Sequence, residues 1–191
     1  MTRRTVPDAA AMEELGREIG RQLRAGDLLV LTGPLGAGKT TLTRGIGEGL
    51  GVRGPVQSPT FVLARTHPSL VGGVPLVHVD AYRLSGAAEL DDLDLDFDHS
   101  AVVVEWGAGL LDGVSDSWLE VLIARRRGGD VDADAAAGAG GDPGADAGSD
   151  LEADEPRVVE LIGHGPRWAA TPYASAARLD PAPGRGAEAA N

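Results

Sequence analysis

The sequence predicts an α/β fold in which three layers form around a central mixed, mainly parallel sheet. Apolar runs typical of strands alternate with segments whose apolar residues recur at helical spacing. A glycine-rich octapeptide, GPLGAGKT, stands at 33–40, between the first strong strand pattern and a helical pattern. At 191 residues the chain is long enough for one such domain with a well-buried core.

The first part of the chain predicts a helix, a buried strand and a second helix. A helix over 9–26, ending at Gly26, carries four apolar residues at helical spacing: Met12, Leu15, Ile19 and Leu23. The apolar run 27–33 closes on a glycine, as a buried strand does. After the octapeptide, a helix over 41–50 carries three apolar residues on one face: Leu42, Ile46 and Leu50.

Five more apolar runs predict strands, and one helical pattern lies among them. The expected strands are 60–66, 74–80, 101–106, 117–126 and 157–164. Between the second and the third of these, the segment GAAELDDLDLDF has two leucines at helical spacing, Leu90 and Leu93. The last two strands would form a hairpin and add antiparallel character at an edge of the sheet.

The formal net charge of −12 is concentrated in one segment. Residues 128–156 hold nine acidic residues and no basic one, which leaves about −3 for the rest of the chain by subtraction. This acidic, low-complexity segment has few large apolar residues, so we expect a disordered loop. The prediction is therefore a single domain made of 1–127 and 157–170, followed by a flexible C-terminal tail, 171–191.

Composition excludes some kinds of site and disfavours membrane and nucleic-acid-binding classes of protein. The chain has no cysteine, so disulfides and thiolate metal sites are excluded. No apolar run approaches the roughly 20 residues of a membrane span, and no signal peptide is visible in 1–16, so we expect a cytoplasmic protein with no membrane partner. The part outside the acidic segment is not basic and carries no basic face with interleaved aromatic residues, so direct reading of tRNA is not expected.

The octapeptide fits the Walker A pattern and so predicts a P-loop NTPase-like fold that binds ATP. Its glycines let backbone N–H groups converge on phosphate oxygens at the N-terminus of a helix. Lys39, the only lysine, would bring a compact charge to the β- and γ-phosphates, and Thr40 would offer a hydroxyl to Mg²⁺. The residues expected to contact ATP in this loop are Gly33, Leu35, Gly36, Ala37, Gly38, Lys39, Thr40 and Thr41.

Two carboxylates at predicted strand ends complete a candidate catalytic set with Lys39. Asp80 ends the strand LVHVD and Glu105 ends VVVEW. Phosphoryl transfer needs Mg²⁺ held opposite the P-loop hydroxyl, so either acid could hold the metal while the other orients the attacking water. GTP is disfavoured as the nucleotide, because an Asn-Lys-x-Asp element is impossible in a chain whose only asparagine is Asn191.

Four motifs in one order carry a family resemblance: LTGPLGAGKTTLTRGIGEGLG, SPTF at 58–61, HVDAYRL at 78–84 and VVVEWG. The chain resembles the bacterial TsaE family, also called YjeE, from about residue 5 to 127 and again near 157–168. The resemblance implies that the chain is the ATPase component of the machinery that makes threonylcarbamoyladenosine in tRNA. The same resemblance implies that the chain hydrolyses ATP slowly. It also implies TsaD-like and TsaB-like partners, with tRNA contacted only indirectly. Met12 departs from the family pattern, in which many members have threonine.

The additional motifs suggest further nucleotide contacts. Pro59 holds Ser58 outside the helical region, so Ser58 and Thr60 could present hydroxyls to the γ-phosphate or Mg²⁺ as a switch loop does. Arg83 could stabilise phosphate charge or pair with a partner, and Trp106 could lie near the nucleotide or an interface. His78 alternates with apolar residues of its strand, and we interpret it as structural.

Three functions stay open at this stage. The first is an ATPase subunit of the tRNA-modifying complex, weak alone and dependent on its partners. The second is a small-molecule kinase, for which a basic lid would be needed; the one arginine cluster, at 124–127, is typical of a solvated strand end. The third is a nucleotide-gated adaptor whose hydrolysis is incidental.

Overall fold

A computed structural model describes residues 1–84, 89, 93, 95–109, 114–125 and 155–175 of the chain. The predicted acidic loop lies outside these residues except for its last two positions. The helical pattern over 86–97 also lies largely outside them. Among the described helices, none is both long and apolar enough to cross a membrane.

The described residues form a mixed seven-stranded sheet in the order β1-β7-β6-β2-β5-β4-β3. The strands are β1 (Thr2–Val6), β2 (Leu28–Thr32), β3 (Ala64–His67), β4 (Leu76–Asp80), β5 (Ala101–Glu105), β6 (Trp118–Arg125) and β7 (Arg157–His164). The four central strands, β6, β2, β5 and β4, are parallel to one another. The pairs β1–β7, β7–β6 and β4–β3 are antiparallel, so the sheet has three parallel and three antiparallel pairs of neighbouring strands. The predicted α/β fold with a mixed sheet is confirmed.

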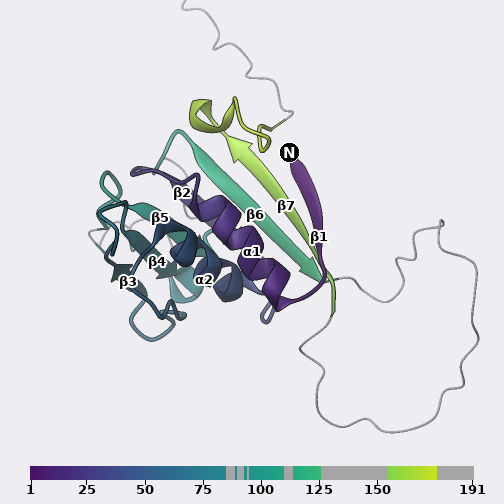
Figure 1. Ribbon diagram of the computed structural model, residues 1–191, viewed down its shortest axis with the longest axis horizontal. Helices are drawn as coiled ribbons and strands as arrows, with labels where there is room; N and C mark the ends of the chain where they lie inside the picture. The colour runs from purple at the N-terminus through teal and green to yellow at the C-terminus, as the bar shows by residue number, and fades with distance from the viewer. Residues whose placement is uncertain (85–88, 90–92, 94, 110–113, 126–154, 176–191) are drawn as a thin grey trace, which may run out of the picture.

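Helices α1 (Ala9–Gly20) and α2 (Lys39–Leu50) lie together on one face of the sheet (Figure 1). Their apolar residues share a core with alternate residues of the strands, such as Leu29, Leu76 and Val103. A second apolar cluster lies on the opposite face, where Val77, Val79, Val102 and Val104 pack against Leu84, Leu93, Leu95 and Phe97. The central strands are apolar on both faces because both faces are covered.

Glycines let α1 and α2 approach each other backbone to backbone. A Cβ on Gly45 of α2 would lie 2.1 Å from the carbonyl oxygen of Glu13 in α1. A Cβ on Gly16 of α1 would lie 2.3 Å from the carbonyl oxygen of Leu42 in α2. No side chain fits at such distances, so the glycines fix the spacing between α1 and the helix that begins at the P-loop.

Gly45→Ala is expected to lower the melting temperature by roughly 5 °C, because inserting a methyl group into a packed contact costs about 1–3 kcal/mol. Alanine favours helix by about 1 kcal/mol over glycine, so helix propensity alone predicts the opposite sign. Gly47→Ala is the control: its Cβ would meet only side-chain methyls, the nearest being Val56 at 2.7 Å, and should cost less. A Gly45→Ala protein at least as stable as the parent in a thermal melt would contradict the spacer role.

Several predicted boundaries were wrong. Strand β1 was not predicted, because in TRRTV only Val6 is buried and no apolar run marks the strand. Helix α1 ends at Gly20 and not at Gly26, where a turn with φ of 84° leads into β2. The strand expected over 60–66 begins only at Ala64, because 60–63 form a turn that includes Leu63 at φ of 63°.

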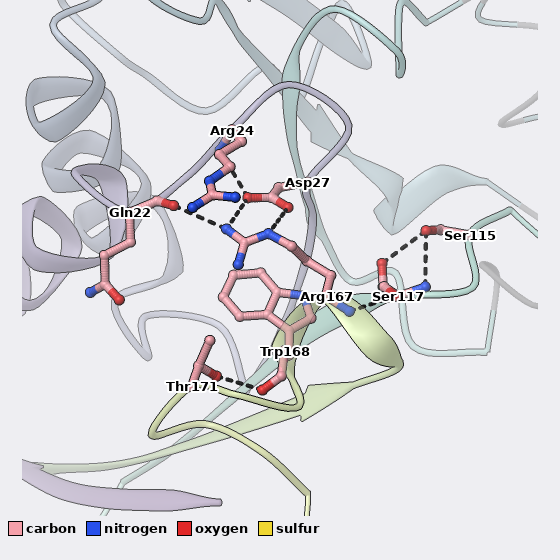
Figure 2. A network of polar contacts seen from close by, with 8 residues as sticks. All are labelled: Gln22, Arg24, Asp27, Ser115, Ser117, Arg167, Trp168 and Thr171. Atoms are coloured by element: carbon pink, nitrogen blue, oxygen red, sulfur yellow. Dashed lines mark hydrogen bonds and ion pairs between the residues drawn. The ribbon is translucent and has the colours of Figure 1, made fainter. Parts of the chain in front are cut away.

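The segment after β7 is tied to the beginning of β2 by a partly buried ion pair (Figure 2). The Arg167 guanidinium donates to both carboxylate oxygens of Asp27 at 2.8 Å, and Asp27 is only 5% exposed. Arg167 also donates to the Gln22 carbonyl oxygen at 3.0 Å. The packed chain continues to Ser175 and not only to the predicted 170, because Tyr173 is buried and its carbonyl oxygen accepts from Gly163 of β7.

Candidate functional site

The loop between β2 and α2 has the backbone geometry of a P-loop. Gly36 and Gly38 take positive φ of 71° and 106°, which L side chains rarely adopt. Gly33 is held close to β6, since a Cβ there would lie 2.6 Å from the Ile123 carbonyl oxygen. Gly38 is the N-cap of α2 and provides no side-chain cap, so the first-turn N–H groups lack that hydrogen-bond partner and can donate to an anion.

Lys39 is folded back over this loop. Its Nζ donates to the carbonyl oxygens of Gly33 at 2.8 Å and Pro34 at 3.1 Å, and it lies 3.7 Å from the centre of the Trp106 ring. Burial lowers the pKa of the ammonium group, and the charges of Glu105 and Asp80 oppose that shift. The cation is therefore held at the loop by weak partners that phosphate oxygens could replace.

Glu105 lies at the carboxyl end of β5, directly beneath the P-loop helix. The Thr40 hydroxyl donates to its Oε1 at 3.0 Å, and His78 Nε2 lies 2.9 Å from the same oxygen. Glu105 is 3% exposed, and among the described residues its Oε2 accepts no hydrogen bond. A buried carboxylate with one free oxygen, next to the P-loop hydroxyl, is suited to hold a cation or orient a water.

Asp80 lies beside Glu105, because the two residues are register partners in neighbouring parallel strands. Its Oδ2 accepts from the hydroxyls of Thr60 at 2.8 Å and Ser58 at 3.3 Å. The segment SPTF therefore reaches the carboxylate at the end of β4. The sequence predicted that both hydroxyls serve the site, and the structure brings them to Asp80.

Two residues next to the site have strained backbones: Trp106 lies under Lys39, and the Leu63 carbonyl oxygen accepts from the Asp80 N–H. Trp106, directly after Glu105, has φ of 65°, and Leu63, which follows SPTF, has φ of 63°. Such left-handed conformations in bulky residues cost about 1–3 kcal/mol each and concentrate at functional sites. Tyr82 packs against Trp106 at 5.9 Å between ring centres, while Arg83 lies over the Phe61 ring at 5.8 Å.

A cavity of about 90 Å³ opens beside the loop. It lies between the beginning of α1, the P-loop and the beginning of β7, and its lining consists of Asp8, Ala9, Met12, Gly36, Ala37, Gly38, Thr41, Glu155 and Arg157. Met12 and Thr41 thus both line this cavity next to the P-loop.

The donors at this site fit Mg²⁺ better than a transition metal. The described residues contain no group of three or more His, Asp or Glu side chains that could cage an ion alone. Thr40, Glu105 and Asp80 instead offer hard oxygens in a partial set, and Mg²⁺ characteristically completes its shell with water and substrate phosphates.

Sequence reasoning found most of this constellation and missed three parts of it. The P-loop, Glu105, Asp80, Ser58, Thr60 and Trp106 come together as expected. The contact of His78 with Glu105 was not predicted. One signal was present: His78 lies two residues before Asp80 in the same strand, so the two side chains lie on the same face of the sheet. Sequence reasoning also missed Arg157 in the cavity and Arg125, whose guanidinium lies 3.4 Å from the carbonyl oxygen of Leu35 in the P-loop.

Comparison with known proteins places this site in a family. The sequence model described as "Threonylcarbamoyl adenosine biosynthesis protein TsaE" matches residues 6–130. A Streptomyces coelicolor protein named "tRNA threonylcarbamoyladenosine biosynthesis protein TsaE" is 53% identical over 161 residues, which cover 83% of this chain and 94% of the relative. The Bacillus subtilis protein of the same name is 40% identical over 103 residues, 53% of this chain and 64% of the relative.

A solved structure supports the fold. The chain described as "Crystal structure of Bacillus subtilus YdiB" matches with a TM-score of 0.56 at 24% identity, and the match covers 87% of this chain and 86% of that one. The family model spans the P-loop, SPTF, HVDAYRL and VVVEWG. On these matches, the chain belongs to the TsaE family of threonylcarbamoyl adenosine biosynthesis proteins.

Proposed function

We propose that this chain is a Mg²⁺-dependent ATPase subunit of tRNA threonylcarbamoyladenosine biosynthesis, acting with TsaD-like and TsaB-like proteins. The observation that carries the proposal is the contact of the P-loop hydroxyl of Thr40 with Glu105, at 3.0 Å, beside a second buried strand-end acid, Asp80. A phosphate-binding loop alone would serve for holding an anion. Hydrolysis also requires a loop hydroxyl next to buried carboxylates, which can hold Mg²⁺ and orient the attacking water.

ATP is the substrate, and each part of the site has a task toward it. The P-loop N–H groups and Lys39 bind the phosphates, and the cavity lined by Met12, Thr41 and Arg157 takes the nucleoside part. When bound, Mg²⁺ would neutralise phosphate charge, held by Thr40 and Glu105. Asp80 keeps Ser58 and Thr60 at the rim of the site, where their hydroxyls can meet the terminal phosphate.

The reaction is the hydrolysis of ATP to ADP and inorganic phosphate. A water oxygen forms a new bond to the γ-phosphorus, the bond from that phosphorus to the bridging oxygen breaks, and a water proton passes to a carboxylate and then to solvent. Of the two acids, the Thr40 contact favours Glu105 for the metal side, which leaves Asp80 to orient the water through its hydroxyl-bearing neighbours.

Hydrolysis by the isolated chain is expected to be slow. Several apolar side chains around the site are open to solvent: Leu35 is 87% exposed, Phe61 is 89% exposed and Tyr82 is 68% exposed. An open site lacks the water-excluding, preorganised charge that accelerates phosphoryl transfer. A partner that covered these side chains would bury apolar surface and close the site in the same step.

The test combines ATP hydrolysis with partner binding. The purified chain should turn over ATP slowly, and the rate should rise at least roughly tenfold when a TsaD-like and TsaB-like pair is added. Because coupling between two binding events is reciprocal, affinity for the pair should differ between ATP-bound and ADP-bound chain. Titrations with ATP, a non-hydrolysable analogue, ADP and no nucleotide measure that difference.

Three results would count against this function. Equal partner affinity in every nucleotide state, with no change in ATPase rate, would remove the coupling. Rapid phosphate transfer to a small hydroxylated acceptor without partners would establish a kinase instead. If ATP binding alone changed partner affinity, and variants unable to hydrolyse ATP were fully active in tRNA modification, the chain would be a nucleotide-gated adaptor instead.

A further inference from the structure

His78 is buried at the centre of the candidate site and has one hydrogen-bond partner among the described residues. Its side chain is fully buried, and Nε2 lies 2.9 Å from Glu105 Oε1. Strand alternation places it on the α2 face of the sheet, since Leu76 belongs to the core with α1 and α2 while Val77 and Val79 belong to the opposite cluster. It therefore lies below the P-loop helix with Asp80.

The contacts of the ring indicate its tautomer. Nδ1 is buried and has no hydrogen-bond partner in the part of the chain that the structure describes. Glu105 offers a carboxylate oxygen, which accepts, so the proton belongs on Nε2. Nδ1 then carries a lone pair, and no buried N–H group is left without an acceptor.

We propose that His78 is a positioning residue for Glu105, and that its Nε2–H fixes the carboxylate with Oε2 left for the metal or the water. Glu105 Oε1 accepts two hydrogen bonds, from Thr40 and His78. Thr40 belongs to the P-loop and responds to the nucleotide, whereas His78 belongs to the buried strand β4. His78 is thus the partner that holds Glu105 whether or not a nucleotide is bound. This role rests on the proposed function.

Two substitutions separate the hydrogen bond from the volume of the ring. His78→Gln carries an amide N–H at the same number of bonds from Cα as Nε2, whereas in His78→Asn the amide lies one bond short, at the level of Nδ1. Both remove the ring and both are polar. Only glutamine can reach Glu105, so the pair compares donor position in similar surroundings.

His78→Asn is expected to lower kcat for ATP by roughly tenfold or more and to raise by a similar factor the Mg²⁺ concentration needed for half-maximal ADP binding, since residues that orient metal ligands typically contribute 10–100-fold. His78→Gln should stay within about threefold of the parent in both measurements. KM for ATP should change little in either variant, because the P-loop contacts remain. Equal values for Asn and Gln, or parent-like values for both, would overturn the positioning role.

The tautomer of His78 can be measured by NMR in the parent protein, and this measurement does not depend on ATP hydrolysis. Long-range ¹H–¹⁵N NMR should show a histidine that is protonated at Nε2 only and exchanges that proton slowly, and the loss of this signal in His78→Asn should assign it to His78 and not to His164, whose Nε2 also lies beside a carboxylate. Protonation at Nδ1 would overturn the assignment. If the parent bound no nucleotide at all, the proposed function would fail while this hydrogen bond could still be confirmed, so the two failures are distinguishable.

Discussion

Lys39→Ala is expected to weaken ATP binding by about 100-fold and to reduce hydrolysis to background. Hydrogen bonds to a charged group contribute up to about 3 kcal/mol, which corresponds to that factor. Arg125 reaches only the carbonyl oxygen of Leu35 in the loop, at 3.4 Å, and its planar guanidinium cannot replace the compact lysine ammonium. Calorimetric titration with ATP and Mg²⁺ measures the affinity.

The control for Lys39→Ala is Arg44→Ala on the same helix. Arg44 is exposed, pairs with Glu13 of α1 at 2.7 Å and does not line the cavity beside the loop, so its loss should leave nucleotide affinity unchanged. Circular dichroism melts of both variants should show a folded protein. Hydrolysis by Lys39→Ala at the parent's rate would mean that the loop does not hold the substrate.

Glu105→Gln is expected to lower kcat roughly 100-fold while nucleotide affinity changes by no more than a few-fold, because a group that acts on water or metal in the reaction contributes most in the transition state. Glutamine keeps the oxygen that accepts from Thr40 and His78, so the substitution removes the charge and preserves the shape. Steady-state kinetics and an ADP titration, both at saturating Mg²⁺, give the two quantities.

Glu120→Gln provides the matched control for Glu105→Gln. Glu120 lies on β6, partly exposed, and pairs with His164 at 3.1 Å. It undergoes the same chemical change outside the site and should retain the parent's kcat. A Glu105→Gln enzyme with kcat close to that of the parent would exclude Glu105 from the reaction and leave Asp80 as the acid to examine.

The local parts of the site could be predicted from the sequence, and the parts that depend on strand register could not. The P-loop is contiguous, so Gly33 to Thr41 carry their own geometry in the spacing of glycines, lysine and threonine. Asp80 and Glu105 were predictable because acids that follow apolar strands meet at one edge of a parallel sheet. The contact of His78 with Glu105 depends on which residues pair between β4 and β5, and no local pattern gives that register.

The backbone outliers and the first strand were beyond prediction for other reasons. Leu63 and Trp106 have residue types that disfavour positive φ, so the sequence predicts the wrong conformation for both. Strand β1 has polar residues at most positions and is stabilised by pairing with β7, a partner from the far end of the chain. Propensity is weak evidence where tertiary pairing decides the structure.

The pairing of β1 with β7 has a consequence for synthesis on the ribosome. Thr2 pairs with Leu161, so at about 5–20 residues per second the first strand waits roughly 8–30 s for its partner. The buried Asp27 carboxylate waits as long for Arg167, the residue that pairs with it. Until then one flank of the nascent sheet is an open edge, the kind of surface that pairs with other chains. The strands that flank the P-loop therefore leave the ribosome before β7, the strand that completes this side of the sheet.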